Sequence, residues 1–112
     1  MIPKEFVING VKYNVRLLES SEKDVNYNLG DFCDILHEIR IAKTVRLEEN
    51  IINLSDDDIL LTYLHELGHC FGDYYKDDHS EEFACAFSHF MFDYLKSRKW
   101  FILLLLKMNV DI

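Results

Sequence analysis

Two histidines and the glutamate that follows the first of them are the residues whose spacing best suits chemistry. His65, Glu66 and His69 form the pattern His-Glu-x-x-His. Because residues four apart lie on one face of a helix, both imidazoles can reach a single metal ion. Glu66 is rotated by about 100° from His65 on such a helix, so it lies beside the ion and is not a ligand. Zinc hydrolases use this arrangement, with the glutamate as general base for a water molecule.

The residues around this pattern predict the helix that it requires. Ser55 and the three aspartates after it resemble a capping box, and the aspartates also suit the positive end of a helix. An apolar stripe at positions i, i+4, i+7 and i+11 consists of Leu60, Leu64, Leu67 and Phe71. The two histidines fall about 140–180° from the start of this stripe. We therefore expect the stripe to pack towards the N-terminal strands and the histidines to face a cleft, with Gly72 ending the helix.

A second helix is predicted after a short polar turn over residues 73–78. Ser80 can cap it, and two carboxylates, Glu81 and Glu82, open it. It runs to about Ser97, where basic side chains suit its negative end. Its apolar stripe is predicted to consist of Phe83, Phe87, Phe90, Met91 and Tyr94.

The first half of the chain predicts strands. Residues 6–17 read as a hairpin with an Asn9-Gly10 turn, and the alternating inward positions are Val11, Tyr13, Val15 and Leu17. Residues 34–42 are predicted as the next strand, with Ile35, Ile39 and Ile41 inward. Residues 19–32 fit a loop or a short helix, and residues 47–53 form a connection. Strands followed by helices indicate an α+β fold, with a small antiparallel sheet packed on two main helices.

Composition limits the classes of function. A chain of 112 residues with one proline and four glycines predicts a single domain spanning residues 1–112. Its net charge of −8 argues against sequence-independent nucleic-acid binding and against adhesion to anionic membranes. Three cysteines without metal-binding spacing indicate free, buried thiols in a reducing cytoplasm. The N-terminus has no apolar signal region, and the apolar run at residues 100–106 is too short to span a membrane. This run fits a buried strand, a final helical turn or an exposed tail that binds a partner.

The helix pair also resembles a known family. His-Glu-Leu-Gly-His at residues 65–69, followed after a short turn by Glu-x-x-Ala-x-x-Phe-Ser from Glu81, is similar to the ImmA/IrrE-type and minigluzincin-like metallopeptidases. The small versions encoded by phages and prophages are the most similar. Upstream, a strand, the turn Asn53-Leu54-Ser55 and the run from Thr62 into the motif match the same pattern. The resemblance covers about residues 35–95 and implies a minimal gluzincin, zincin-like core.

The resemblance also implies the third metal ligand. Zinc held by two histidines needs one more protein ligand and leaves a fourth position for water. In the family, a small residue follows the ligand glutamate at +3 and an apolar residue follows at +6. Glu81 meets this pattern with Ala84 and Phe87, whereas Glu82, the alternative, meets it less well. Relatives usually carry a polar residue at +4 that orients a ligand histidine, but this chain has Cys85, so we expect weaker metal binding or activity.

Taken together, these features predict a zinc metallopeptidase. His65, His69 and Glu81 would hold Zn²⁺, although Mn, Co or Ni suit the same ligands, and Glu66 would take a proton from water and pass it to the leaving amine. A protein or peptide substrate, or a regulatory protein, is the expected partner. The strand at residues 38–42 could hold an extended peptide.

Donors for the transition state are not assured by the sequence. Tyr74, Tyr75 and His79 on the connecting turn are candidates, whereas His37 and His89 are expected to be structural. The main alternative is a non-catalytic, zinc-stabilised binding or regulatory protein, such as one encoded by a phage, that retains the peptidase fold. The other alternative is a zinc-free domain with an accidental motif.

Overall fold

The structure is a computed structural model that describes residues 2–19, 29–76 and 80–98, together with Leu103 and Lys107. Strands occupy the first half of the described chain and helices the second. The strands are β1 (Glu5–Ile8), β2 (Val11–Leu18), β3 (Gly30–Cys33), β4 (Glu38–Ala42), β5 (Thr44–Leu47) and β6 (Asn50–Asn53). They are followed by α1 (Asp56–Phe71), the π-helical turn η2 (Gly72–Lys76) and α2 (Glu81–Ser97). The predicted α+β fold is confirmed.

A four-stranded sheet with the order β1-β2-β4-β3 supports the helices. β1 and β2 form the predicted hairpin, in which Asn9 and Gly10 have φ values of 52° and 77°, as the tight turn requires. β3 and β4 are antiparallel, but β2 and β4 run parallel, with Val15 opposite Ile39. The sheet is therefore mixed, not wholly antiparallel as expected. The chain passes from β2 to β3 at the far edge and then reverses into β4, which lies between them and runs parallel to β2.

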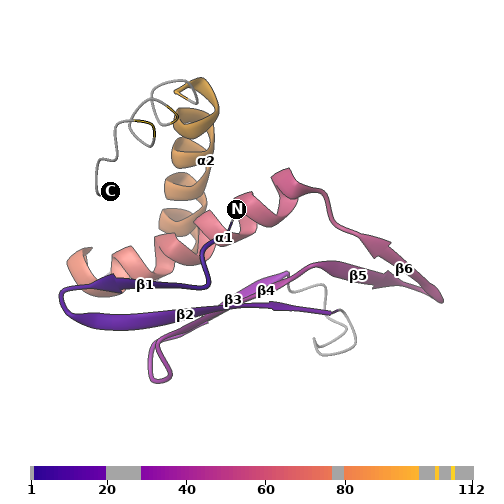
Figure 1. Cartoon of the computed structure of the whole chain (residues 1–112), viewed down its shortest axis with the longest axis horizontal. Helices are drawn as coiled ribbons and strands as arrows, with labels where there is room; N and C mark the ends of the chain where they lie inside the picture. Colours follow the sequence, from indigo (N-terminus) through magenta and orange to yellow (C-terminus); the bar gives the residue numbers. More distant parts are fainter. Residues whose placement is uncertain (1, 20–28, 77–79, 99–102, 104–106, 108–112) are drawn as a thin grey trace.

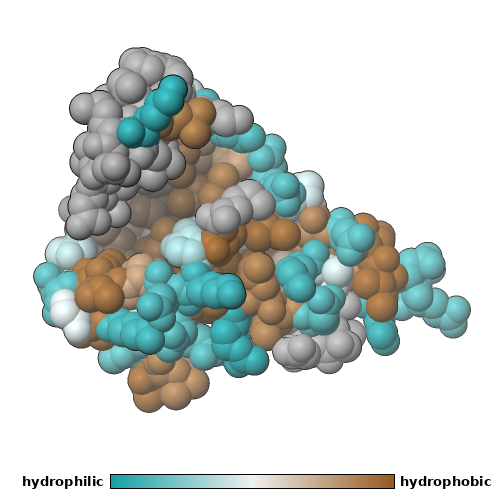
Figure 2. Space-filling model, in the orientation of Figure 1, coloured by the Kyte–Doolittle hydropathy of each residue, from teal (hydrophilic) through white to brown (hydrophobic). Residues whose placement is uncertain are grey.

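Two predicted segments of the first half need correction. Residues 30–33, expected in a loop or short helix, form the edge strand β3, and the expected strand over residues 34–42 begins only at Glu38. Residues 34–37 form the turn between β3 and β4, where Ile35 and Leu36 are 84% and 64% exposed. The hydrophobic projection at the lower edge of Figure 2 coincides with this turn in Figure 1. Ile35 was thus wrongly placed inward, since its strand register does not extend into the turn.

The core lies between the sheet and α1. Ile39 and Ile41 are fully buried and join Val15 and Tyr63 in one cluster, as the alternation in β4 predicts. Tyr13 is 1% exposed and stacks on Phe6. At the end of β2 the alternation changes, because Leu18 is buried whereas the predicted Leu17 is 44% exposed. The connection over residues 47–53 contributes to a separate hairpin, β5–β6, which extends away from the sheet in Figure 1.

The two helices cross closely, as Figure 1 shows. Ser55 caps α1 by accepting a hydrogen bond from the amide of Asp58, and Ser80 caps α2 in the same way from Phe83. Gly68 lies so near α2 that an added Cβ would stand 3.0 Å from the Cα of Ala84. This contact brings the N-terminal turn of α2 over the histidine face of α1.

Two predictions about the helices are confirmed only in part. The α-helix α1 ends at Phe71 with Gly72 as its C-cap, as predicted, but Gly72 is not left-handed, because its φ and ψ are −62° and −41° and the chain continues into η2. In α2, Phe83 and Phe87 pack on Phe71, but Phe90 is 68% exposed. The predicted apolar stripe of α2 is therefore only partly covered, since Phe90 and Tyr94 are exposed whereas Phe83, Phe87 and Met91 are half-buried.

The predictions about the cysteines and the apolar run can be compared with the described residues. All three cysteines are free, but only Cys70 is buried, while Cys33 is partly buried and Cys85 is exposed. Within the described residues, no helix has the length and apolar character needed to cross a membrane. The run at residues 100–106 lies outside the described residues except for Leu103, which is helical and 55% exposed.

Candidate metal centre

The two histidines of α1 and one glutamate of α2 converge. His65 Nε2 lies 2.9 Å from one carboxylate oxygen of Glu81, and His69 Nε2 lies 2.8 Å from the other. Ligand atoms from the three residues all lie within 4.8 Å of one another, so this group can hold a metal ion. Glu82 is not part of the group, because Glu81, the first residue of α2, is the carboxylate that faces the histidines of α1.

The helix geometry explains this convergence. His65 and His69 are one turn apart on α1, and their rings lie 5.0 Å apart, edge to face. Both side chains are mostly covered, at 21% and 16% exposure, whereas Glu81 is 75% exposed at the start of α2. Two partly buried imidazoles on α1 thus lie next to a carboxylate on the exposed side of the cluster.

The charges of the group also favour a cation. Although desolvation acts to raise it, the pKa of Glu81 is lowered on balance by the charges and hydrogen bonds of His69 and His65. The carboxylate is therefore ionised and can only accept hydrogen bonds, so each imidazole donates through Nε2 in the absence of an ion. The same nitrogen lone pairs become available to a metal when the proton moves to Nδ1.

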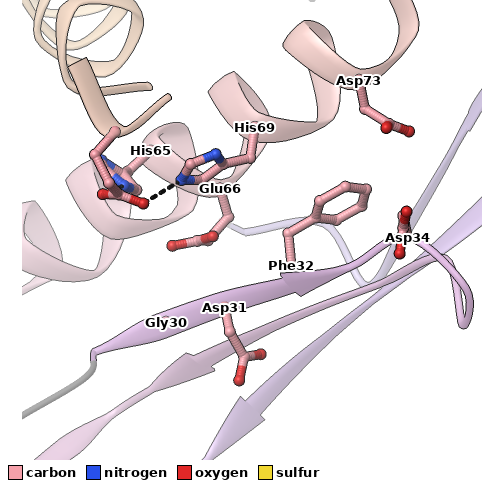
Figure 3. A pocket seen from close by; sticks show the side chains of 9 residues that line it. Gly30, Asp31, Phe32, Asp34, His65, Glu66, His69 and Asp73 are labelled. Carbon is pink, nitrogen blue, oxygen red and sulfur yellow. Dashed lines mark hydrogen bonds and ion pairs between the residues drawn. The ribbon is translucent and has the colours of Figure 1, made fainter. Parts of the chain in front are cut away.

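Glu66 lies beside the group without joining it. Its side chain is 6% exposed, the residue lines the same pocket as the histidines, and Figure 3 shows its carboxylate between α1 and β3. A Cβ on Gly30 would lie 3.3 Å from a Glu66 carboxylate oxygen and 2.7 Å from the Thr62 methyl group. Glycine at the start of β3 therefore lets the edge strand pass close over this carboxylate.

Cys85 occupies the position behind His65. Its sulfur lies 3.7 Å from His65 Nδ1, which is within the range of a weak hydrogen bond to sulfur. The residue that the sequence placed at +4 from Glu81 does therefore reach a ligand histidine. A thiol offers a weaker acceptor than a carboxylate, so it orients the imidazole less firmly.

Two hollows meet at Glu66 and His65. The larger, of about 420 Å³, contains the metal-binding group and is bounded on the far side by β3. Its lining, most of which Figure 3 labels, consists of Gly30, Asp31, Phe32, Asp34, His65, Glu66, His69, Asp73 and Glu81. The smaller, of about 250 Å³, shares Gly30, His65 and Glu66. A cleft therefore runs along the edge strand on both sides of the group.

Several candidate residues lie elsewhere. Tyr74 packs edge-on against Tyr13, and Tyr75 lies against Phe71, so neither is among the described residues that line the cleft. His79 lies outside the described residues. His37 has a φ of 50° and its ring lies 5.2 Å from that of Tyr13, which agrees with a structural role.

The structure adds residues that the sequence did not indicate. His89, expected to be structural, lines the smaller hollow. Gly30, Phe32, Asp34 and Asp73 line the larger one, although three of them belong to segments predicted as a loop or a different strand. Gly30 was the available signal, since a glycine within a strand often marks a close backbone approach.

Comparison with known proteins adds no relative: no family model, curated protein or solved structure matches this chain. The functional argument therefore rests on the chemistry of the cleft.

Proposed function

We propose that this protein is a zinc-dependent metallopeptidase of the gluzincin type, similar to the ImmA/IrrE-like enzymes of phages and prophages. The observation that supports this most is the buried carboxylate of Glu66, which lines the pocket of the metal-binding group but is not one of its members. A purely structural metal site has no use for such a base. The His₂Glu donor set suits zinc, which favours imidazole and carboxylate and keeps a position open in catalytic sites.

In this proposal, His65, His69 and Glu81 hold the ion, which supplies Lewis-acid activation of water and of the peptide carbonyl. Glu66 accepts a proton from the attacking water on its carboxylate and returns it to the amine that leaves. Burial of Glu66 against Gly30 excludes bulk water from one side of the carboxylate. His65 is kept in position by the Cys85 sulfur at its Nδ1.

The sheet order suggests how a peptide would bind. The strand expected to hold the substrate, β4 (Glu38–Ala42), pairs with β2 on one side and β3 on the other, so its backbone groups are already used. β3 is at the edge of the sheet and lines the cleft through Gly30 and Phe32. An extended peptide would therefore add beside β3, which corrects the strand that the sequence indicated.

Peptide hydrolysis by the zinc-loaded protein tests the proposal. We expect cleavage of a mixed-sequence fluorogenic peptide library by wild type and a loss of at least about 100-fold in Glu66→Gln, since general-base catalysis contributes roughly 10²–10⁴-fold. Glu82→Gln is the matched control, because it removes a neighbouring surface carboxylate outside the metal-binding group. Equal cleavage by wild type and Glu66→Gln would contradict the proposal.

A second function, a zinc-stabilised binding protein without turnover, is favoured by two observations. Cys85 stands where a stronger acceptor would orient His65, and the predicted donors Tyr74 and Tyr75 pack away from the cleft. In that case the ion ties α1 to α2, and its removal destabilises the fold without loss of any activity.

A further inference from the structure

Away from the metal-binding group, α2 carries an exposed row of residues with a regular order. Residues four apart on a helix form one of the ridges by which helices pack against each other. On α2 one such ridge is exposed over its whole length and consists of Glu82, Ala86, Phe90, Tyr94 and Arg98. Figure 1 shows that the C-terminal half of α2, where the last three of these residues lie, stands away from the sheet.

The centre of this ridge is apolar and incompletely covered. Phe90 and Tyr94 are 68% and 44% exposed, although their rings stack with centroids 6.4 Å apart. Phe87, one turn earlier on α2, is half-buried because it packs on Phe71 of α1. The exposed rings therefore extend an apolar surface that begins where the two helices meet. Covering them would remove apolar area from water.

The two ends of the ridge carry opposite charges. Glu82 lies in the first turn of α2 and Arg98 is its C-cap residue, and both are exposed. Neither makes an ion pair within the described residues, whereas Lys96, which is outside the ridge, pairs with Asp57 of α1. A partner that fits the ridge would therefore be basic opposite Glu82 and acidic opposite Arg98.

The ridge itself has this complementary order when it is read in the opposite direction. Phe90 lies eight residues from either end, so two antiparallel copies can meet with one Phe90 beside the other. Ala86 then lies opposite Tyr94 of the second copy, which sets a small side chain against a large ring. Glu82 lies opposite Arg98 of the second copy, and this contact occurs twice. Two parallel copies would instead bring like charges together.

The ridge and the metal-binding group lie on opposite sides of α2. Phe90 follows Glu81 by nine residues, which at about 100° per residue corresponds to half a turn around the helix. Ala84, which faces Gly68 of α1, is about 120° from Phe90 by the same measure. A second copy can therefore cover the ridge without displacing α1 and without closing the cleft.

We propose that two copies of this chain associate through this ridge, with their α2 helices antiparallel about a twofold axis at Phe90. Burial of Phe90 and Tyr94 supplies the attraction, and the Glu82–Arg98 contacts fix the register. The contact uses one face of a helix of 17 residues, about 25 Å long, so it is smaller than the interface of an obligate dimer. We expect a dissociation constant on the order of 10 μM.

Sedimentation velocity of the full chain, from about tenfold below to tenfold above this constant, measures the association. Wild type should show an equilibrium between monomer and dimer. Phe90→Glu should weaken the dimer by at least about tenfold, because it brings two carboxylates together at the axis. Leu36→Glu is the matched control, since Leu36 is 64% exposed outside α2 and the variant gains the same charge. It should associate as wild type does.

Charge reversals test the antiparallel register. Glu82→Arg and Arg98→Glu should each weaken the dimer by about fivefold, because each replaces two attractive contacts at the surface by two repulsive ones. The double variant should return to within about twofold of wild type, since opposite charges face each other again. An equimolar mixture of the two single variants should form mixed dimers for the same reason. A thermal melt confirms that each variant is folded.

Three results would overturn the inference. A monomer at every concentration is expected if the apolar run at residues 100–106 or a different protein covers the ridge. A dimer that persists in Phe90→Glu would show that the copies associate through another surface. A double charge reversal that remains as weak as the single variants would exclude the antiparallel contact between Glu82 and Arg98.

Discussion

At the scale of single residues, the unusual feature is a sulfur atom behind a ligand histidine. The Cys85 sulfur lies 3.7 Å from His65 Nδ1, too far for a strong hydrogen bond. A carboxylate there would accept the Nδ1 proton more strongly, fix the tautomer and make Nε2 a better ligand. The residue at position 85 therefore determines how firmly the His65 ring is oriented and how well its Nε2 binds a metal ion.

Replacing this cysteine should strengthen metal binding. An aspartate side chain at residue 85 is one bond longer than the cysteine side chain, so a carboxylate oxygen can approach His65 Nδ1 more closely than the sulfur does. We expect Cys85→Asp to raise zinc affinity by about tenfold, at the lower end of the range for such partners. Competition with a chromogenic chelator measures the change. Cys85→Ala is the control, and an aspartate variant that binds no better than the alanine variant would contradict this role.

At the scale of elements, the site depends on how closely α1 approaches α2. Gly68 faces Ala84, which is fully buried, and an added Cβ would lie 3.0 Å from its Cα and 3.2 Å from its carbonyl oxygen. These are backbone atoms, so the contact is relieved only by moving a helix. The spacing of the helices is what places Glu81 within reach of both histidines.

A Gly68→Ala substitution should therefore destabilise the fold. Alanine gains up to about 1 kcal/mol in helix propensity, but overpacking costs about 1–3 kcal/mol, so we expect a net loss. Urea unfolding of the metal-free protein measures it. Asp93→Ala, an exposed change on α2, should stay within about 0.5 kcal/mol of wild type. An unchanged or higher free energy of unfolding in Gly68→Ala would show that the helices have room to separate.

The helices were more predictable from sequence than the sheet, for local physical reasons. Ser55 and Ser80 indicate where their helices begin, because helix capping involves only neighbouring residues. Asn9-Gly10 does the same for the hairpin through its φ values. β3 has no such signal, because its four residues become a strand only by pairing with β4. The exposed turn at Ile35 shows that apolar residues alone do not define a strand.

The residues of the candidate site were likewise predictable only where they are close together in the sequence. His65, Glu66 and His69 are adjacent on one helix, so their spacing alone predicted their common face. Glu81 was indicated by a resemblance and is brought to the histidines by packing. Asp34 and Asp73 lie on segments that meet only in the folded chain, so no spacing rule could place them in one cleft.

At the scale of the whole molecule, a bound ion would join the layer of α1 to that of α2. The His65–His69–Glu81 group bridges the two helices, whereas the hydrophobic cluster joins α1 to the sheet. Because metal binds only the folded arrangement, its binding free energy adds to stability. Metal content and thermal stability should therefore change together.

The most direct test is the zinc content of purified wild type, Glu81→Ala, Glu82→Ala and Glu66→Gln, each with a thermal melt before and after chelation. We expect close to one zinc per chain in wild type, Glu82→Ala and Glu66→Gln, and a lower melting temperature on chelation in all three. In Glu81→Ala we expect no bound zinc and no change of melting temperature on chelation. A wild type without stoichiometric zinc and with a melt unchanged by chelator would contradict the account.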